Sequence, residues 1–263
     1  MYITNAAAPA GLGASRIQRI AADFTGSTPI EEVVAIPAVG APPQRIEGNP
    51  DGSQDVIKFG SNSVPAPNAM VFDSHGGLYV SDSFQGAIFR IPNAAGCNSA
   101  CPVDTIAHDP LLATAGFPPF GANGLALSHY GKTLFVANTG DDRVLKVDLT
   151  SAAPSKPVSV FAESINGADG IAFDDDGRLW VAANQNDEVV ALNGNGRVIK
   201  RVGEFEGIDR RGAPKGLLFP ASIVIDDDWM YVTNLALPLT GAAGDEPEED
   251  VKVWTVARIR IPR

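Results

Sequence analysis

The sequence is poor in positive charge. Its 263 residues include 20 Lys and Arg against 31 Asp and Glu, which gives a formal net charge of −11 at pH 7. A nucleic-acid-binding protein needs a basic face to neutralise phosphates, and the sequence shows none. An anionic membrane surface would also repel this chain. The charge balance therefore argues against nucleic acid as a partner and makes cations the natural small partners.

Long hydrophobic runs are missing as well. No apolar stretch approaches the roughly 20 residues that a helix needs to span a bilayer, so we predict no membrane insertion. No helical periodicity of 3.6 residues competes with the strand patterns described below. The P-loop, the GxGxxG loop and the Gly-x-Ser-x-Gly elbow are absent, which removes the nucleotide-binding and hydrolase classes that depend on them.

Cysteine is scarce, because the chain has only Cys97 and Cys101, four positions apart in a short loop that contains glycine. This spacing fits a local disulfide, which would favour an oxidising compartment. Two reduced thiols in a loop are the alternative, whereas a metal site would need more ligands than two sulfurs. Together with the acidic, Gly- and Pro-rich composition, the pair favours a periplasmic or secreted protein.

Glycine and proline are abundant, at 27 and 20 residues, which indicates many turns between short strands. Between the turns one pattern recurs: a large apolar residue, then Val or Ile, then a small residue and often Asn or Asp. Its copies are residues 2–5, 79–82, 135–138, 180–183 and 231–234. The last four copies start 56, 45 and 51 residues apart (79, 135, 180, 231), close to the roughly 40–50 residues of a propeller blade.

Further strands accompany each copy of this pattern. A third strand follows every copy, at residues 16–20, 87–91, 143–147, 188–192 and 257–261. An inner apolar strand and a tight turn precede four copies, with the strands at 68–73, 123–128, 169–174 and 221–226. Because the inner strands are almost continuously apolar, we expect them to be buried on both faces. Outer fourth strands are expected at 103–107, 158–162 and 197–202.

This strand order predicts an all-β fold, a β-propeller of four-stranded blades, as a single domain over residues 1–263. Five blade units are recognisable, and residues 41–67, rich in Pro, Gly and Asn, are expected to form an irregular connection between the first two. The first unit starts at its second strand, and the last unit ends after its third. We therefore expect Met1 to lie inside a blade, in a protein truncated at its N-terminus.

The inner strands and the residues that follow them resemble one protein family. Residues 68–73, 123–128 and 169–182 are similar to the gluconolactonase / senescence-marker-protein family, and the likeness extends over residues 65–262. Within it, residues 122–138 resemble that family's fourth blade and residues 168–192 its fifth. NHL-repeat propellers share the same blade pattern.

The resemblance implies a six-bladed, metal-dependent hydrolase. Family members hold one divalent cation, usually Ca²⁺, through a Glu of the first blade, two Asn and an Asp, and by motif the last three fall on Asn68, Asn123 and Asp169. The resemblance also makes Asp169 the general base or nucleophile for hydrolysis of a lactone or phosphoester. Two features depart from the family: no segment with the Glu precedes Met1, and Ala66 stands where sugar lactonases have arginine.

The chemistry of the three residues agrees with a cation site. Oxygen-bearing side chains occupy the same position on three adjacent inner strands, so they should converge at one mouth of the channel, and calcium prefers oxygen ligands. The alternative is that these side chains end the strands and bond local backbone, as Asn and Asp do in many turns. Ala221 at the equivalent position of the last unit argues against that alternative, because a turn requirement would apply to every unit.

Other polar groups favour structural roles. His75 and His129 fall in expected hairpin turns and His108 follows an outer strand, so we expect all three at the surface. Residues 174–177 are expected to form a hairpin turn, because the rest of a calcium-binding loop is missing. The acidic run at residues 245–250 is expected to be a mobile, solvated loop between two strands.

Two functions remain open on the sequence. The first is a hydrolase of a small-molecule lactone or related ester that depends on Ca²⁺ or another divalent cation. The second is a noncatalytic, NHL-like propeller that binds a ligand or a protein partner. A cation held between Asn68, Asn123 and Asp169 would distinguish the first from the second.

Overall fold

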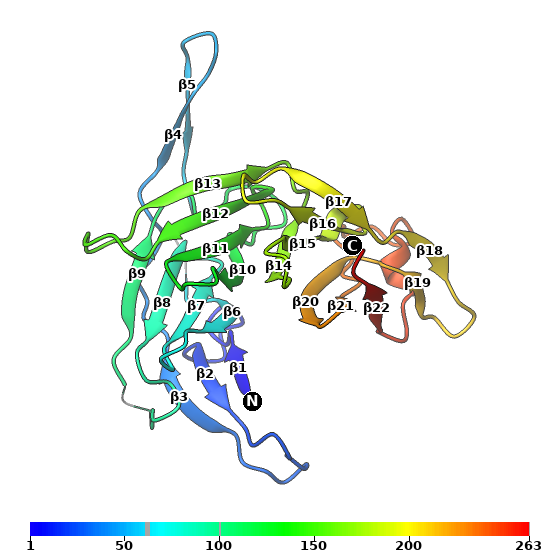
Figure 1. Ribbon diagram of the computed structural model, residues 1–263, viewed down its shortest axis with the longest axis horizontal. Coiled ribbons are helices and arrows are strands. Elements are labelled where there is room, and N and C mark those ends of the chain that lie inside the picture. Colours follow the sequence, from blue (N-terminus) through cyan, green and yellow to red (C-terminus); the bar gives the residue numbers. More distant parts are fainter. Residues whose placement is uncertain (61–63, 100, 263) are drawn as a thin grey trace. The chain divides into compact units, whose positions relative to one another are not determined.

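The computed structural model describes residues 1–60, 64–99 and 101–262, which form a series of small antiparallel sheets (Figure 1). In this part of the chain, helix is confined to two short 3-10 turns, η1 (Asn184–Asn186) and η2 (Pro247–Asp250). No helix among these residues is long and apolar enough to cross a membrane. The predicted all-β fold is confirmed, and five of the sheets are the blades of a β-propeller.

Three blade sheets have four strands each, hydrogen-bonded in the order in which the chain makes them. The first consists of β6 (Pro67–Phe72), β7 (Leu78–Asp82), β8 (Ala87–Ile91) and β9 (Asp104–His108). The second consists of β10 (Ala122–Leu127), β11 (Thr133–Asn138), β12 (Arg143–Asp148) and β13 (Val158–Glu163). The third consists of β14 (Ala168–Phe173), β15 (Leu179–Ala183), β16 (Glu188–Leu192) and β17 (Val198–Val202). The three predicted outer strands are therefore confirmed as β9, β13 and β17.

The sheets at the two ends of the sequence have three strands. One contains β1 (Tyr2–Asn5), β2 (Arg16–Arg19) and β3 (Glu31–Ala35). The other contains β20 (Pro220–Asp226), β21 (Trp229–Asn234) and β22 (Val256–Arg260). As predicted, β22 is the third strand of its sheet, whereas the assignment of β1 as a second strand stays a prediction.

The chain divides into two compact units. One comprises Met1–Asp141 and Leu145–Ser159, and the other comprises Asp142–Val144 and Val160–Arg263. The boundary passes through β12 and β13. Each unit contains blade sheets of its own, and the expectation that they form a single propeller domain stays a prediction.

Between residues 41 and 67, the described part (41–60 and 64–67) has more regular structure than the sequence suggested. It contains a hairpin of β4 (Arg45–Gly48) and β5 (Gln54–Ile57), so the expectation of a wholly irregular connection is wrong. The turn is closed by the Asn49 N–H donating to the carbonyl of Ser53 at 2.8 Å, and Asp51 Oδ1 accepts the Ser53 N–H at 2.9 Å. The hairpin buries little apolar surface, which is why its hydrophobic alternation is weak in the sequence. A second unforeseen hairpin joins β18 (Phe205–Ile208) to β19 (Pro214–Gly216).

Apolar side chains from neighbouring sheets form the core of each unit. In the first unit Ile17, Val80 and Phe89 are completely buried in one cluster, which joins the sheet that begins with β1 to the sheet that begins with β6. In the second unit Trp180 and Met230 are completely buried between the sheets that begin with β14 and β20. Burial of side chains of this size contributes about 1.5–3 kcal/mol each.

In two of the four-stranded sheets the second strand is more deeply buried than the inner strand. Every residue of β7 and β15 is buried, whereas most residues of β6 and β14 are only partly so. A second strand has a neighbour on either side within its sheet, while the inner strand is the first strand of the sheet. The expectation that inner strands are buried on both faces is therefore wrong for β6, β14 and β20, and it holds for most of β10.

The turn between β14 and β15 is organised by one aspartate. Asp174 Oδ1 accepts the backbone N–H of Arg178 at 2.9 Å, and Oδ2 accepts from Arg178 Nε and Trp180 Nε1, each at 2.6 Å. Burial by itself would raise the pKa of Asp174, but these hydrogen bonds outweigh it and hold that pKa below its usual value. Residues 174–177 are thus a hairpin turn, as predicted.

We expect Asp174→Asn to lower the free energy of unfolding by about 1–3 kcal/mol at pH 7, because the ion pair with Arg178 is lost from a buried position. The folded-state pKa is depressed, so the ionised group stabilises the fold above the unfolded-state pKa of about 3.9, and this contribution is lost as the pH falls through the folded value. Urea unfolding of the wild type and the variant should show a smaller difference at pH 3 than at pH 7.

Asp176→Asn is the matched control, because Asp176 pairs with the same arginine but its side chain is 71% exposed. This variant should cost less than about 1 kcal/mol. An Asp174→Asn penalty that is the same at both pH values would contradict the role assigned to the charge.

Candidate metal centre

Four inner strands begin with the same irregularity, a β-bulge. In β6 the register passes from Pro67 opposite Asp82 to Met70 opposite Val80, which leaves one extra residue on the inner strand. The inner strands β10, β14 and β20 show the same shift after their first residue. The three predicted metal ligands and Ala221 are the second residues of these strands, and each therefore lies in the bulge. A bulge changes the direction of the local side chains and is often found beside functional sites.

A backbone hydrogen bond marks a second equivalent position in each of these four sheets. The residue that directly follows the second strand donates its N–H to the carbonyl of the residue two places before the bulge position. These bonds are Ser83 to Ala66 (3.0 Å), Thr139 to Gly121 (3.3 Å), Asn184 to Gly167 (3.1 Å) and Leu235 to Phe219 (3.1 Å). We call Ser83, Thr139, Asn184 and Leu235 the partner positions.

In three of the sheets the bulge residue and the partner position are also joined by their side chains. The bonds are Asn68 Nδ2 to Ser83 Oγ (3.0 Å), Asn123 Nδ2 to Thr139 Oγ1 (2.9 Å) and Asn184 Nδ2 to Asp169 Oδ2 (3.3 Å). The remaining sheet of these four begins with β20 and is called the fourth sheet below. It has Ala221 and Leu235 at the two positions, so both members of that pair are apolar. The bonds run to buried side chains, whereas the alternative interpretation expected bonds to local backbone.

Asn68 and Asn123 are connected within one unit. Their inner strands, β6 and β10, contact each other, and Ser83 lies between them. Its hydroxyl accepts from Asn68 and donates to the carbonyl of Ala122 at 2.8 Å, directly before Asn123. Asp169 belongs to the other unit, so its convergence with the two asparagines stays a prediction.

The donor chemistry fits a hard divalent cation. Each asparagine uses its amide nitrogen in the bond to the partner position, which makes the amide oxygen the atom for a ligand. Asp169 adds a carboxylate, and Asn184, which is 2% exposed, has a buried amide oxygen without a hydrogen-bond partner among the described residues. Calcium takes carboxylate and amide oxygens of this kind.

Gly167 is the residue that makes room for Asn184. Its φ is +65°, and a Cβ at this position would lie 1.8 Å from Asn184 Oδ1. The carbonyl of Gly167 also accepts the Asn184 N–H. A side chain at position 167 would therefore displace the amide group that binds Asp169.

The last residue of the repeated motif has a structural role. Asp82 accepts the N–H groups of Ala66 and Gln85, each at 2.9 Å, and so holds the segment that leads into β6. Burial raises the pKa of Asp82 in spite of these bonds. Asn138 and Asn234 likewise bond backbone groups of the segments that lead into β10 and β20. This explains why Asn or Asp recurs at that place in the motif.

The remaining polar candidates lie away from this arrangement or are explained by their neighbours. His75 and His129 are exposed in hairpin turns, as predicted, whereas His108 is half-buried with Nε2 3.2 Å from the Gly40 carbonyl. Ala66, at the place of the sugar-lactonase arginine, is buried and contributes only backbone groups to the bonds seen there.

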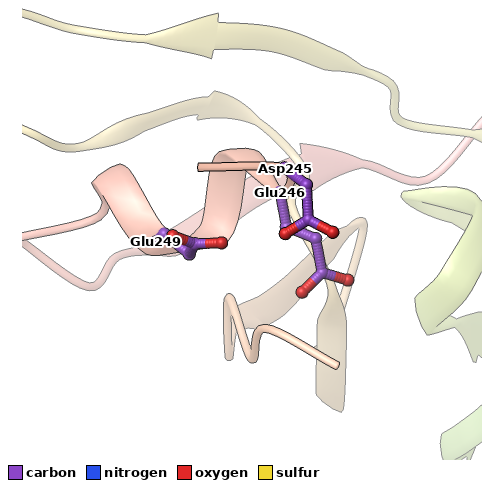
Figure 2. Close-up of side chains that lie close together, drawn as sticks. All are labelled: Asp245, Glu246 and Glu249. Atoms are coloured by element: carbon purple, nitrogen blue, oxygen red, sulfur yellow. The ribbon is translucent and has the colours of Figure 1, made fainter. Parts of the chain in front are cut away.

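The acidic run lies in the loop between β21 and β22, where the carboxylates of Asp245, Glu246 and Glu249 gather within 4.8 Å of one another (Figure 2). Glu246 accepts the backbone N–H groups of Leu239 (2.7 Å) and Thr240 (2.9 Å), and Glu249 accepts that of Gly244 (2.7 Å). The cluster is largely exposed, and its carboxylates are engaged in folding the loop. Part of the run forms η2, so it has more local structure than an open loop.

The comparisons with known proteins agree with the family resemblance over part of the chain. Residues 116–203 match the family described as "SMP-30/Gluconolactonase/LRE-like region", and this stretch, about a third of the chain, includes Asn123 and Asp169 with their partner positions. The resemblance to that family is confirmed for these residues. No curated protein sequence matches the chain.

Solved structures match over more of the chain. A luciferin-regenerating enzyme has a TM-score of 0.53 at 17% identity, with 92% of this chain and 77% of that chain covered. A gluconolactonase from Xanthomonas campestris has a TM-score of 0.47 at 15% identity, with 83% and 75% covered. A virginiamycin B lyase from Staphylococcus aureus has a TM-score of 0.46 at 14% identity, with 93% and 69% covered. The first of these likenesses supports the propeller fold.

We expect Gly167→Ala to destabilise the protein more than Gly177→Ala does. Both glycines have positive φ, +65° and +75°, so both alanines incur the same backbone strain of about 1–2 kcal/mol. Only the Gly167 variant also drives a methyl group into Asn184, which adds about 1–3 kcal/mol, whereas nothing lies within 4 Å of a Cβ at Gly177. Urea unfolding measures both losses, and equal losses would show that Gly167 is not needed to seat Asn184.

Proposed function

We propose that this protein is a hydrolase of small-molecule lactones or related esters that depends on Ca²⁺ or another divalent cation. The observation that supports this most directly is the set of bulge residues Asn68, Asn123 and Asp169. They occupy equivalent positions and are each joined to a buried polar side chain, while the fourth sheet lacks both members of the pair. The match of residues 116–203 to the gluconolactonase-like family supports the same chemistry.

Each residue has a definite role in this proposal. The amide oxygens of Asn68 and Asn123 and the carboxylate of Asp169 would hold the cation, and the bound cation would polarise the substrate carbonyl or lower the pKa of a water molecule. The net charge of −11 favours accumulation of cations near the protein. The buried Ala66 in place of an arginine argues for a substrate other than a sugar lactone.

Asp169 would act as the general base in hydrolysis. Its carboxylate takes a proton from the attacking water, while the water oxygen forms a bond to the carbonyl carbon of the lactone. The ring C–O bond then breaks, and the proton returns to the departing alkoxide oxygen, which gives the hydroxy acid. Asn184 Nδ2 holds the carboxylate in place through its bond to Oδ2.

We further propose a periplasmic or secreted location. The expected disulfide is present between Cys97 and Cys101, whose Cα atoms lie 5.6 Å apart. Bridges of this kind persist in oxidising compartments.

Turnover of lactones and aryl esters should require a divalent cation and Asp169. In a screen of these substrates, chelation by EDTA should abolish hydrolysis and added Ca²⁺ should restore it. Asp169→Asn should lower kcat/KM by about 10²- to 10⁴-fold, because the general base is lost. Ala221→Ser, at the equivalent position of the fourth sheet, is the control and should retain activity.

Hydrolysis that persists in EDTA would contradict the proposal. Calcium binding without turnover of any lactone or ester would instead favour a noncatalytic propeller that binds a ligand or a partner.

A further inference from the structure

The polar residues at the partner positions are buried more completely than their chemistry would favour. Ser83, Thr139 and Asn184 are 3%, 1% and 2% exposed, respectively. Burial of a polar side chain is costly unless it is hydrogen-bonded. All three are bonded to a bulge residue, and these are the residues that we predict to hold a cation.

The fold itself does not require a polar side chain at this position. Leu235 forms the same backbone hydrogen bond as the other three residues, yet it is apolar and 41% exposed, and the bulge residue of its sheet is Ala221. The bulge in β20 also forms without a polar pair. The backbone bond and the bulge therefore do not by themselves account for the polar side chains.

In each pair, the hydrogen bond determines which side-chain atom of the bulge residue faces the partner position and which atom faces away from it. Ser83 donates its single hydroxyl proton to the carbonyl of Ala122, so its oxygen can only accept from Asn68. The Asn68 amide nitrogen is thereby turned toward Ser83, and its amide oxygen is turned away. The bond from Asn123 to Thr139 has the same donor atom, Nδ2, and therefore the same consequence.

In the third pair the bulge residue is the acceptor of the hydrogen bond, whereas in the first two pairs it is the donor. A carboxylate has no proton to donate, and here the partner position is an asparagine whose Nδ2 donates to Asp169 Oδ2. Where the bulge residue is an amide, the partner can accept, and where it is a carboxylate, the partner donates. The side chain at the partner position is thus matched to the bulge residue in each sheet.

We propose that Ser83, Thr139 and Asn184 are positioning residues for the cation site. They act through the bulge residues, by orienting the amide groups of Asn68 and Asn123 and the carboxylate of Asp169 so that oxygen atoms face the cation. This inference rests on the proposed function, because it assumes that these three residues bind a cation. Hydrogen-bonded partners of metal ligands typically contribute a factor of about 10 to 100 in metal affinity.

The most informative variant is Thr139→Val, which preserves the shape of the side chain and removes its hydroxyl. Isothermal titration with calcium should show affinity about 10- to 100-fold weaker than in the wild type. Thr139→Ser keeps the hydroxyl and should restore most of that loss. Leu235→Val, at the partner position of the fourth sheet, is the matched control and should bind calcium as the wild type does.

A second readout separates positioning from a general role in stability. A ligand that binds only the folded state raises Tm, and at a fixed ligand concentration the increase grows with the logarithm of its affinity. The increase in Tm on addition of calcium should therefore shrink in Thr139→Val and be retained in Thr139→Ser. A purely structural role would lower Tm equally with calcium and with EDTA.

Two results would overturn the inference, and they are distinguishable. If the wild type binds calcium and Thr139→Val binds it equally well, the positioning role is wrong while the proposed function stands. If the wild type itself binds no calcium, the proposed function and the positioning role both fail. Ser83→Ala provides an independent repeat of the test at the neighbouring blade, with the same expected loss of affinity.

Discussion

A backbone hydrogen bond sets the geometry on which the blades depend. In four sheets the residue that follows the second strand donates its N–H to the carbonyl just before the inner strand, at 3.0 to 3.3 Å. This bond ties the exit of one strand to the entrance of another and fixes where the bulge falls. The bulge then determines the direction of a single side chain per blade. Any site formed by those side chains is consequently built by repetition of one local structure.

Polar groups at this end of the sheets are satisfied in two layers. The first layer is the backbone bond common to the four sheets, and in three of them the side chains of Asp82, Asn138 and Asn234 add bonds to the segments that lead into the inner strands. The side-chain layer is present in three sheets only. The sheet that starts with β20 forms its bulge without this side-chain pair, so the pair is not required for that local structure.

Much of the fold could be predicted from the sequence, because the blade motif repeats and its strands alternate apolar and polar residues. The short hairpin of β4 and β5 escaped prediction, since Ile46 and Val56 are exposed and leave only a weak hydrophobic pattern. The inner strands β6 and β14 are about as apolar as the second strands β7 and β15, so the difference in burial within these two pairs could not be predicted from the sequence.

The candidate site could be predicted in part. The bulge residues are recognisable because they occupy the same position in each copy of the repeat and match a family motif. The partner positions were missed because Ser83, Thr139 and Asn184 share no residue type, and only the backbone bond shows that they are equivalent. The signal available in the sequence was the polar residue directly after three of the five motif copies, whereas Ala6 and Leu235 follow the other two.

The most direct test of the account is a crystal structure of the protein grown with manganese, whose anomalous scattering locates a cation without reference to activity. The account predicts one ion with Asn68 Oδ1, Asn123 Oδ1 and the Asp169 carboxylate all within about 2.0–2.6 Å of it. The side chains of Ser83, Thr139 and Asn184 should keep their bonds to these three residues. A structure in which Asp169 lies far from the two asparagines, or in which the ion binds elsewhere, would contradict it.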